Sequence, residues 1–239
     1  MRKMFMGVIL MVGMGSGCWA DLAEAERAMM RYDFATARSI LLPMAEAGDP
    51  RAQVLLADVA SLNYPGDPVE VEKWLRKAAA QGDAEGQRRL SIFLGRSKSS
   101  EALEWLERSA AQGNASALTD LGVKLTYGED CPIDFQKAAR CFAQAAATGD
   151  GIAQAWYGDC FRLGQGVPPD DERAYFWLKL AVDRDERVRG KDWERDLGRI
   201  ASRLSQSQRD RLDKEVSEWQ PSSSAPPPDT DPASSPSRK

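Results

Sequence analysis

Hydrophobic and small residues return along this chain in one pattern, Trp-Leu-x-x-Ala-Ala-x-x-Gly, at steps of 31 to 36 residues. Trp74, Trp105, Cys141 and Trp177 occupy one column of this repeat, and Ile40 fills the same slot upstream. A period of this length is typical of stacked helical hairpins, because one hairpin cannot bury its apolar face without its neighbours. The pattern predicts an all-α fold, a right-handed α-solenoid of stacked antiparallel helix pairs.

Each period holds two helical stretches. The first is expected to begin near a small residue and to carry a second small residue five positions later, so that two helices can approach closely. These pairs are Ala52 and Ala57, Gly86 and Ser91, Ala117 and Gly122, and Ala153 and Gly158. The second helix carries the tryptophan column. We predict that Trp74, Trp105 and Trp177 are core residues packed with Gly122 and Gly158, each indole contributing about 3 kcal/mol on burial.

Helix ends are also visible in the sequence. Gly48, Gly82, Gly113 and Gly149 each follow a run of helix formers, where a left-handed residue can end the helix. Asp49-Pro50 and Asp67-Pro68 each place an N-cap before a proline at the first helical position.

After the last repeat, residues 186–220 are predicted to form helices that cap the exposed end of the stack. Ser205 and Gln208 have the spacing of a capping box, and Leu212, Val216 and Trp219 form an apolar edge at helical spacing. A helix that binds a partner is the alternative for this edge.

Residues 1–20 have the pattern of a signal peptide. Arg2 and Lys3 precede an uncharged stretch, and Cys18-Trp19-Ala20 suits cleavage before Asp21. We therefore expect export to the periplasm. A retained membrane anchor is one alternative, although the stretch is short for a span; lipidation at Cys18 is another, and it would give the chain its membrane contact.

The other end, residues 221–239, holds six prolines and six serines and no large apolar side chain. Such a segment cannot bury enough surface to offset its chain entropy, so we expect a disordered tail. A segment that a partner recognises through its prolines is the alternative.

Between the two ends, residues 21–50 are expected to form a leading half repeat, and residues 51–185 are expected to form the complete repeats.

Charge and composition narrow the function. The formal net charge is −4, and removal of residues 1–20 would take it to −6, because that segment holds two basic residues and no acidic ones. A mildly acidic chain of mixed charge lacks the basic patch that nucleic-acid binding requires, so we expect no nucleic-acid partner. The sequence has no histidine, which excludes triads and metal sites that need one.

No nucleotide loop, metal spacing or activated nucleophile is present, so we predict neither a cofactor nor a metal and expect no enzymatic activity. Asp170, Asp171 and Glu172 could form a carboxylate pair for acid or base chemistry. They fall where a helix begins, however, and negative charge there is ordinary capping.

The segment Ala153-Gln-Ala-Trp-Tyr-Gly-Asp-Cys-Phe-Arg-Leu-Gly-Gln-Gly-Val-Pro-Pro-Asp170, followed by Ala174, Trp177 and Ala181, resembles the Sel1-like repeat, a relative of the tetratricopeptide repeat. The resemblance covers about residues 34–185 and implies a bacterial exported solenoid that binds proteins. Two copies depart from the pattern, in the loops at residues 62–68 and 95–100, which either face a partner or have drifted neutrally.

Cysteine-rich members of this family join their hairpins through cysteines at positions that are Ala146 and Gln154 here, so that disulfide framework is not expected. Cys131, Cys141 and Cys160 remain, an odd number for an oxidising compartment. A bridge between Cys131 and Cys160 is a hypothesis. Cys141 reads as a core residue rather than a nucleophile.

The predicted function is a non-enzymatic periplasmic adaptor or scaffold of the cell envelope that binds a protein partner. An immunity protein that neutralises a toxic effector is the alternative, and a hydrolase a remote one. If the groove geometry of tetratricopeptide proteins transfers, several polar residues of the first helices face the partner; the alternative is that they are merely solvated. These residues are Arg51, Asp58, Glu85, Arg88, Thr119, Asp159 and Arg162.

Overall fold

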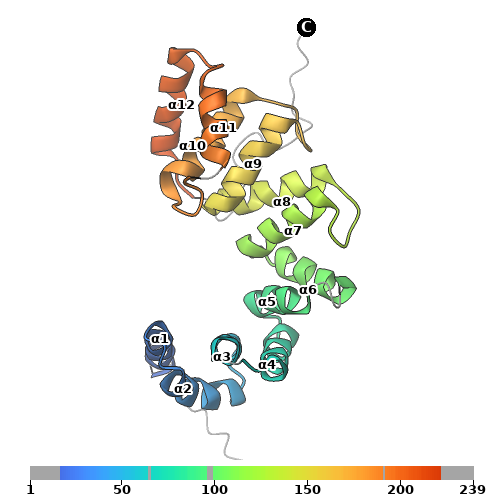
Figure 1. Cartoon of the computed structure of the whole chain (residues 1–239), viewed down its shortest axis with the longest axis vertical. Coiled ribbons are helices and arrows are strands. Elements are labelled where there is room, and N and C mark those ends of the chain that lie inside the picture. Colours follow the sequence, from blue (N-terminus) through green and yellow to red (C-terminus); the bar gives the residue numbers. More distant parts are fainter. Residues whose placement is uncertain (1–16, 64–65, 96–98, 191, 222–239) are drawn as a thin grey trace, which may run out of the picture. The chain divides into compact units, whose positions relative to one another are not determined.

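The computed structural model describes residues 17–63, 66–95, 99–190 and 192–221, which form twelve α-helices and no strand (Figure 1). The predicted all-α repeat fold is therefore confirmed, whereas its handedness stays a prediction. Most of the expected signal peptide and nearly all of the expected tail lie outside the described residues. Export, lipidation at Cys18 and disorder of the tail stay predictions for that reason.

The helices divide into two compact units, one ending at Gln81 and the other beginning at Gly82. In unit 1 each helix packs against the next along the chain. The pair of Arg38 and Glu70 also joins the second helix to the fourth through two hydrogen bonds of 2.8 Å. The helices of unit 1 are α1 (Gly17–Met30), α2 (Phe34–Glu46), α3 (Pro50–Leu62) and α4 (Pro68–Ala80).

Unit 2 continues the hairpin pattern, and the last two helices of the described chain pack against the tenth. Within the described residues, no helix of either unit is long and apolar enough to cross a membrane. The helices of unit 2 are α5 (Ala84–Leu94), α6 (Ser99–Ala111), α7 (Ala115–Tyr127), α8 (Phe135–Ala147), α9 (Gly151–Leu163), α10 (Asp171–Arg184), α11 (Asp192–Ala201) and α12 (Gln206–Glu218).

The first helix of each hairpin begins two residues earlier than the pattern of small residues predicted. Its N-cap is an acidic residue or an asparagine whose side chain accepts a backbone N–H three residues on, and the preceding glycine has a positive φ. The caps are Asp49, Asp83, Asn114 and Asp150. The capping positions predicted at Asp49 and Asp67 are confirmed.

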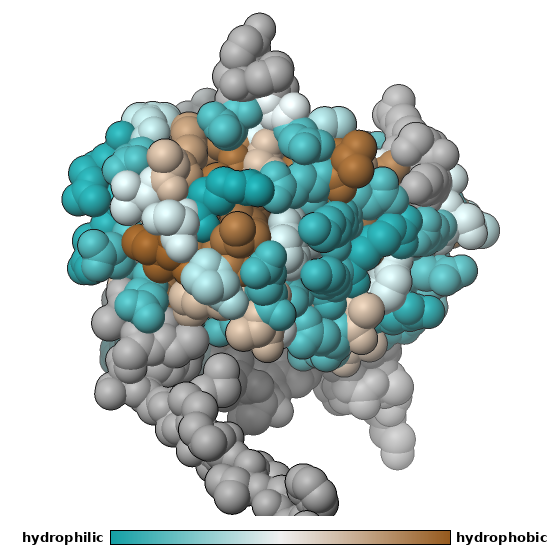
Figure 2. All heavy atoms as spheres, turned by 90° about the horizontal axis from the view of Figure 1, so that it is seen from below, coloured by the Kyte–Doolittle hydropathy of each residue, from teal (hydrophilic) through white to brown (hydrophobic). Residues whose placement is uncertain are grey.

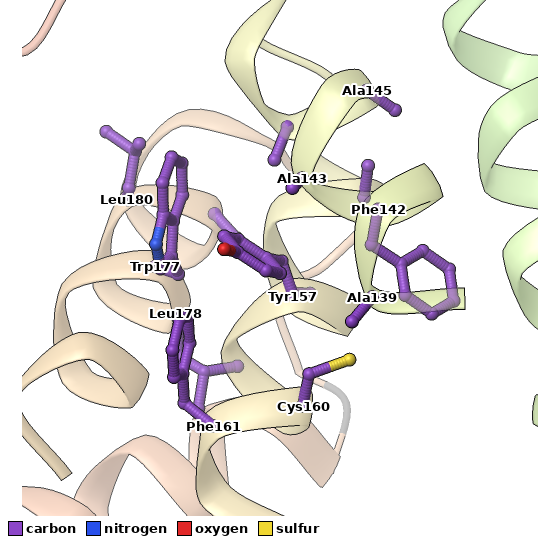
Figure 3. Packing of buried hydrophobic residues seen from close by; sticks show 14 of the residues in the cluster. Ala139, Phe142, Ala143, Ala145, Tyr157, Cys160, Phe161, Trp177, Leu178 and Leu180 are labelled. Atoms are coloured by element: carbon purple, nitrogen blue, oxygen red, sulfur yellow. The ribbon is translucent and has the colours of Figure 1, made fainter. Parts of the chain in front are cut away.

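The core of unit 2 consists of small residues, mainly alanine, packed against large aromatic and aliphatic ones (Figure 3). Trp177 of α10 is 4 % exposed and lies 5.3 Å from the ring of Tyr157 on α9. A Cβ at Gly122 would lie 2.5 Å from Cε1 of Phe142, so a larger residue on α7 would displace this buried ring of α8. In unit 1, Trp74 is 1 % exposed.

Trp105 differs from the other two tryptophans, because its side chain is only partly buried where the sequence predicted a core residue. Its indole N–H donates to Glu101 over 3.3 Å, and the Arg108 guanidinium lies over the ring at 4.5 Å. Charged neighbours on its own helix thus cover part of the ring where apolar neighbours were expected.

The hypothesis of a bridge between Cys131 and Cys160 is wrong for this structure, since Cys131, Cys141 and Cys160 are all free thiols. Cys131 lies partly exposed between α7 and α8, whereas Cys160 is buried inside α9. Burial raises the pKa of Cys141 to about 11 and that of Cys160 to about 12. Both thiols are therefore protonated at neutral pH and are not activated nucleophiles.

The C-terminal helix α12 covers α10, as expected of a cap. The predicted capping box of Ser205 and Gln208 is present. Leu212 and Val216 are buried, and the hydroxyl of Tyr175 on α10 donates to Asp213 over 2.8 Å.

Candidate functional site

A pocket of about 790 Å³ opens in unit 2 where the C-terminal ends of α7 and α9 approach α11. Its lining combines aromatic rings with charged side chains, so it is more polar than the mainly apolar lining of a typical small-molecule site. The lining residues are Thr126, Tyr127, Phe135, Trp156, Asp159, Arg162, Leu163, Gln165, Gly190, Asp192, Trp193, Arg195 and Asp196.

Two aromatic rings of the lining stand nearly perpendicular to a third, that of Trp156. Trp156 stacks on Phe142 beneath it, with centroids 5.6 Å apart and planes 10° apart. Tyr127 lies 6.0 Å from Trp156 at 83°, and Trp193 lies 5.7 Å from it at 80°. Edge-to-face contacts are a favourable arrangement for aromatic pairs and add about 0.5 to 1.5 kcal/mol beyond the burial of their area. The rings of Tyr127, Trp156 and Trp193 thus form an aromatic box contributed by α7, α9 and α11.

A chain of charged groups fixes α11 to α9. Asp159 accepts hydrogen bonds from Arg162 Nε over 2.6 Å and from the indole N–H of Trp193 over 2.7 Å. Arg162 Nη2 also lies 3.4 Å from Asp196 Oδ2, and Arg199 donates to Asp196 over 3.0 Å. Because Asp159 and Asp196 are buried, these bonds compensate charges that water no longer solvates.

Burial raises the pKa of Asp159 above its ordinary value, while its bonds to Arg162 and Trp193 oppose that shift. Both carboxylate oxygens of Asp159 already accept a donor from the protein. The carboxylate therefore serves as a fixed acceptor that positions Trp193, and it is poorly placed for proton transfer to a bound molecule.

The structure brings only two of the seven predicted partner-facing residues, Asp159 and Arg162, into this pocket. They contact the chain's own α11, where the sequence predicted an open groove. Thr119 was placed wrongly, because it is buried and its hydroxyl donates to the carbonyl of Ala115 on the same helix.

The other four predicted residues lie apart from the pocket. Arg88 bridges α5 and α7, with its Nε 3.1 Å from Asp120 Oδ2, and it lies 3.5 Å from Glu85 on its own helix. Burial raises the pKa of Asp120, which the charge of Arg88 opposes. In unit 1, Arg51 pairs with Glu26 at 3.5 Å, and Asp58 is partly buried on α3.

Sequence reasoning missed Tyr127, Trp156 and Trp193, which carry the aromatic box. Trp156 directly precedes the core residue Tyr157. Its position on the helix gave no sign that its ring lines a pocket. Tyr127 and Leu163 hold the same place in consecutive repeats, each the last residue of its helix before a glycine. A large side chain repeated at that place was the one available signal.

Exposed large hydrophobic side chains are few and scattered among the described residues. Figure 2 shows one face on which hydrophilic residues predominate and hydrophobic ones gather at a few separate places. Tyr127, 59 % exposed, and Leu163, 51 % exposed, both line the pocket, so apolar exposure and concavity coincide there. No group of three or more Cys, Asp or Glu side chains in the described part of the chain could hold a metal ion.

Comparison with known proteins identifies the repeats. The model of the Sel1 repeat matches residues 50–83, 84–114, 115–150 and 151–186. A Sel1 repeat protein from Oxalobacter formigenes is similar in structure, with a TM-score of 0.63 and 25 % identity over 85 % of this chain and 90 % of that one. No curated protein matches the sequence.

A protective antigen of uropathogenic Escherichia coli strains, which displays an SLR fold, is similar with a TM-score of 0.52 and 21 % identity over 83 % of this chain. This chain spans about half of that antigen, 52 % of its length, and the likeness concerns the fold alone.

Proposed function

Because the chain belongs to the Sel1 repeat family, whose repeats are generally protein–protein interaction modules, we propose that it is an exported, non-enzymatic adaptor that binds a protein partner through the pocket between α7, α9 and α11. The observation that carries the proposal is the aromatic box of Tyr127, Trp156 and Trp193 beside Arg162. Tryptophan, tyrosine and arginine are the residues most enriched at the energetic centres of protein interfaces.

The contacts that Trp193 and Trp156 make within the protein favour binding. Trp193 is held by Asp159, and Trp156 by Phe142, so neither ring loses much freedom when a partner docks. Side chains that are already fixed lower the entropic cost of association. The charged residues around the box are paired with one another, which gives the pocket a polar rim without an unpaired charge.

Export is supported by residues 1–20, whose basic start, uncharged middle and Cys18-Trp19-Ala20 end have the order of a signal peptide. A role as an adaptor of the cell envelope agrees with this segment and with a binding surface. It also agrees with a sequence that has no histidine for catalysis.

The test begins with crosslinking in native cells, followed by mass spectrometry of the captured proteins. The captured partner is then titrated against the wild-type chain and against Tyr127→Ala, which removes an exposed ring with no hydrogen bond to the described residues. We expect Tyr127→Ala to weaken binding about 30-fold, the effect of losing about 2 kcal/mol at an interface centre.

The matched control is Val69→Ala, which shortens a side chain that is 78 % exposed on α4 of unit 1. It should leave the affinity unchanged. Equal affinities of the wild-type chain and Tyr127→Ala would show that the partner binds elsewhere and would overturn the proposal.

A further inference from the structure

Two hydrogen-bond donors of the aromatic box have no partner among the described residues. The indole N–H of Trp156 and the hydroxyl of Tyr127 make no hydrogen bond there, although both residues line the pocket. The indole N–H of Trp193, in contrast, is used by Asp159. The box therefore offers aromatic faces together with two free donors, a combination that suits a ligand with exposed carbonyl groups.

The charges of the pocket argue against a strongly ionic ligand. Asp159 and Asp196 share Arg162, and Asp192 lies 2.8 Å from Arg195. The lining thus holds three carboxylates and two guanidinium groups that largely neutralise one another. A ligand gains more here from ring contacts and hydrogen bonds than from net charge.

A proline-rich segment meets these requirements. Polyproline II helices have no internal hydrogen bonds, so their carbonyls are free to accept, and their rings pack on aromatic side chains. Their extended shape exists before binding, which lowers the entropic cost.

This chain carries such a segment at its own C-terminus. Residues 222–239 hold the run Pro226-Pro227-Pro228 and two further prolines, at positions 232 and 236. The side-chain charges of the segment sum to zero, because it holds two aspartates, one arginine and one lysine. The segment therefore offers the proline rings, free carbonyls and low net charge that suit the aromatic rings and free donors of the pocket.

The described chain ends within reach of the pocket. The ring of Pro221 lies beside Gly149, just before α9 begins, since a Cβ at Gly149 would be 3.3 Å from Pro221 Cγ. The pocket lies at the other end of α9, which is about 20 Å long. Eighteen extended residues span about 60 Å. The segment can therefore follow the length of α9 and still place its prolines at Trp156.

We propose that residues 222–239 dock into the aromatic box of Tyr127, Trp156 and Trp193 through their prolines and occupy the pocket until a partner displaces them. The proposal rests on the proposed function in that it concerns the same pocket. It makes the chain its own competing ligand and sets a threshold that a partner must exceed to bind.

The test follows the indole N–H signal of Trp156 by NMR, assigned through Trp156→Phe. We compare the full chain, a chain ending at Pro221, and the full chain with Pro226, Pro227 and Pro228 all replaced by alanine. The Trp156 signal should differ between the full chain and both altered chains, while the Trp74 signal in unit 1 serves as the internal control. An identical Trp156 signal in all three chains would overturn the proposal.

A second measurement titrates a synthetic peptide of residues 222–239 into the chain ending at Pro221. A tethered segment has an effective concentration of about 1 mM, so docking in the full chain requires a Kd below about 1 mM in this titration. The peptide should shift the indole N–H signal of Trp156, and Tyr127→Ala should abolish that shift. Absence of any shift up to several millimolar peptide would contradict the proposal. Partner binding that still depends on Tyr127 would then leave the proposed function standing.

Discussion

Two glycines set how closely the helices of unit 2 approach. A Cβ at Gly158 would lie 2.8 Å from Leu178 Cγ, 3.1 Å from the backbone nitrogen of Leu178 and 3.3 Å from the carbonyl oxygen of Ala174. Two of these three atoms are backbone atoms of α10, so the helix itself would have to move. At Gly122 the nearest atoms belong to the Phe142 ring, which also supports Trp156 from below. Gly122 thus links helix packing to the pocket.

The first prediction concerns Gly158→Ala. We expect the free energy of unfolding to fall by about 1 to 3 kcal/mol, because the added methyl overpacks the contact with α10. Urea denaturation followed by circular dichroism measures it. Gly198→Ala is the matched control, since nothing lies within 4 Å of a Cβ at this position on α11. It should raise stability by about 0.5 to 1 kcal/mol. Effects of equal sign at the two glycines would refute this account of the packing.

At the scale of helices, the sequence predicts the repeated elements well and their irregular partners poorly. Caps such as Asp49 and Ser205 depend on neighbouring residues, so local patterns identify them. The packing of α11 depends on Asp159 and Arg162, more than thirty residues upstream of the Trp193 and Asp196 that they contact. Acids and bases mixed along α11 therefore look solvated in sequence, although Asp196 is buried. The pocket that these contacts create could not be predicted for the same reason.

A second prediction concerns the pair that joins α2 to α4. Arg38 donates two hydrogen bonds to Glu70 and lowers the pKa of this carboxyl below its ordinary value of 4.5. A lowered pKa adds stability that is present above the unfolded value and is lost as the pH falls through the folded value. The melting temperature of the wild-type chain should therefore fall as the pH drops from 5.5 to about 3, and Glu70→Gln should reduce that dependence. Parallel curves of melting temperature against pH for the wild-type chain and Glu70→Gln would contradict this prediction.

At the scale of the whole molecule, the repeats and the C-terminal helices together form the proposed binding surface. The third and fourth matched repeats supply α7 and α9, while α11 follows the last matched residue, 186. The aromatic box needs both contributions, because Trp193 comes from the cap and Trp156 from the repeats. Sel1 repeats are in general protein-interaction modules, and here the C-terminal helix α11 supplies one side of the pocket.

The central claim is that a protein partner binds at the pocket between α7, α9 and α11. Hydrogen exchange of the full chain, with and without the captured partner, tests it most directly. Binding should slow exchange at the C-terminal end of α7, in the second half of α9 and along α11, with little change in α3 and α4 of unit 1. Protection confined to unit 1, or to α12 alone, would contradict it.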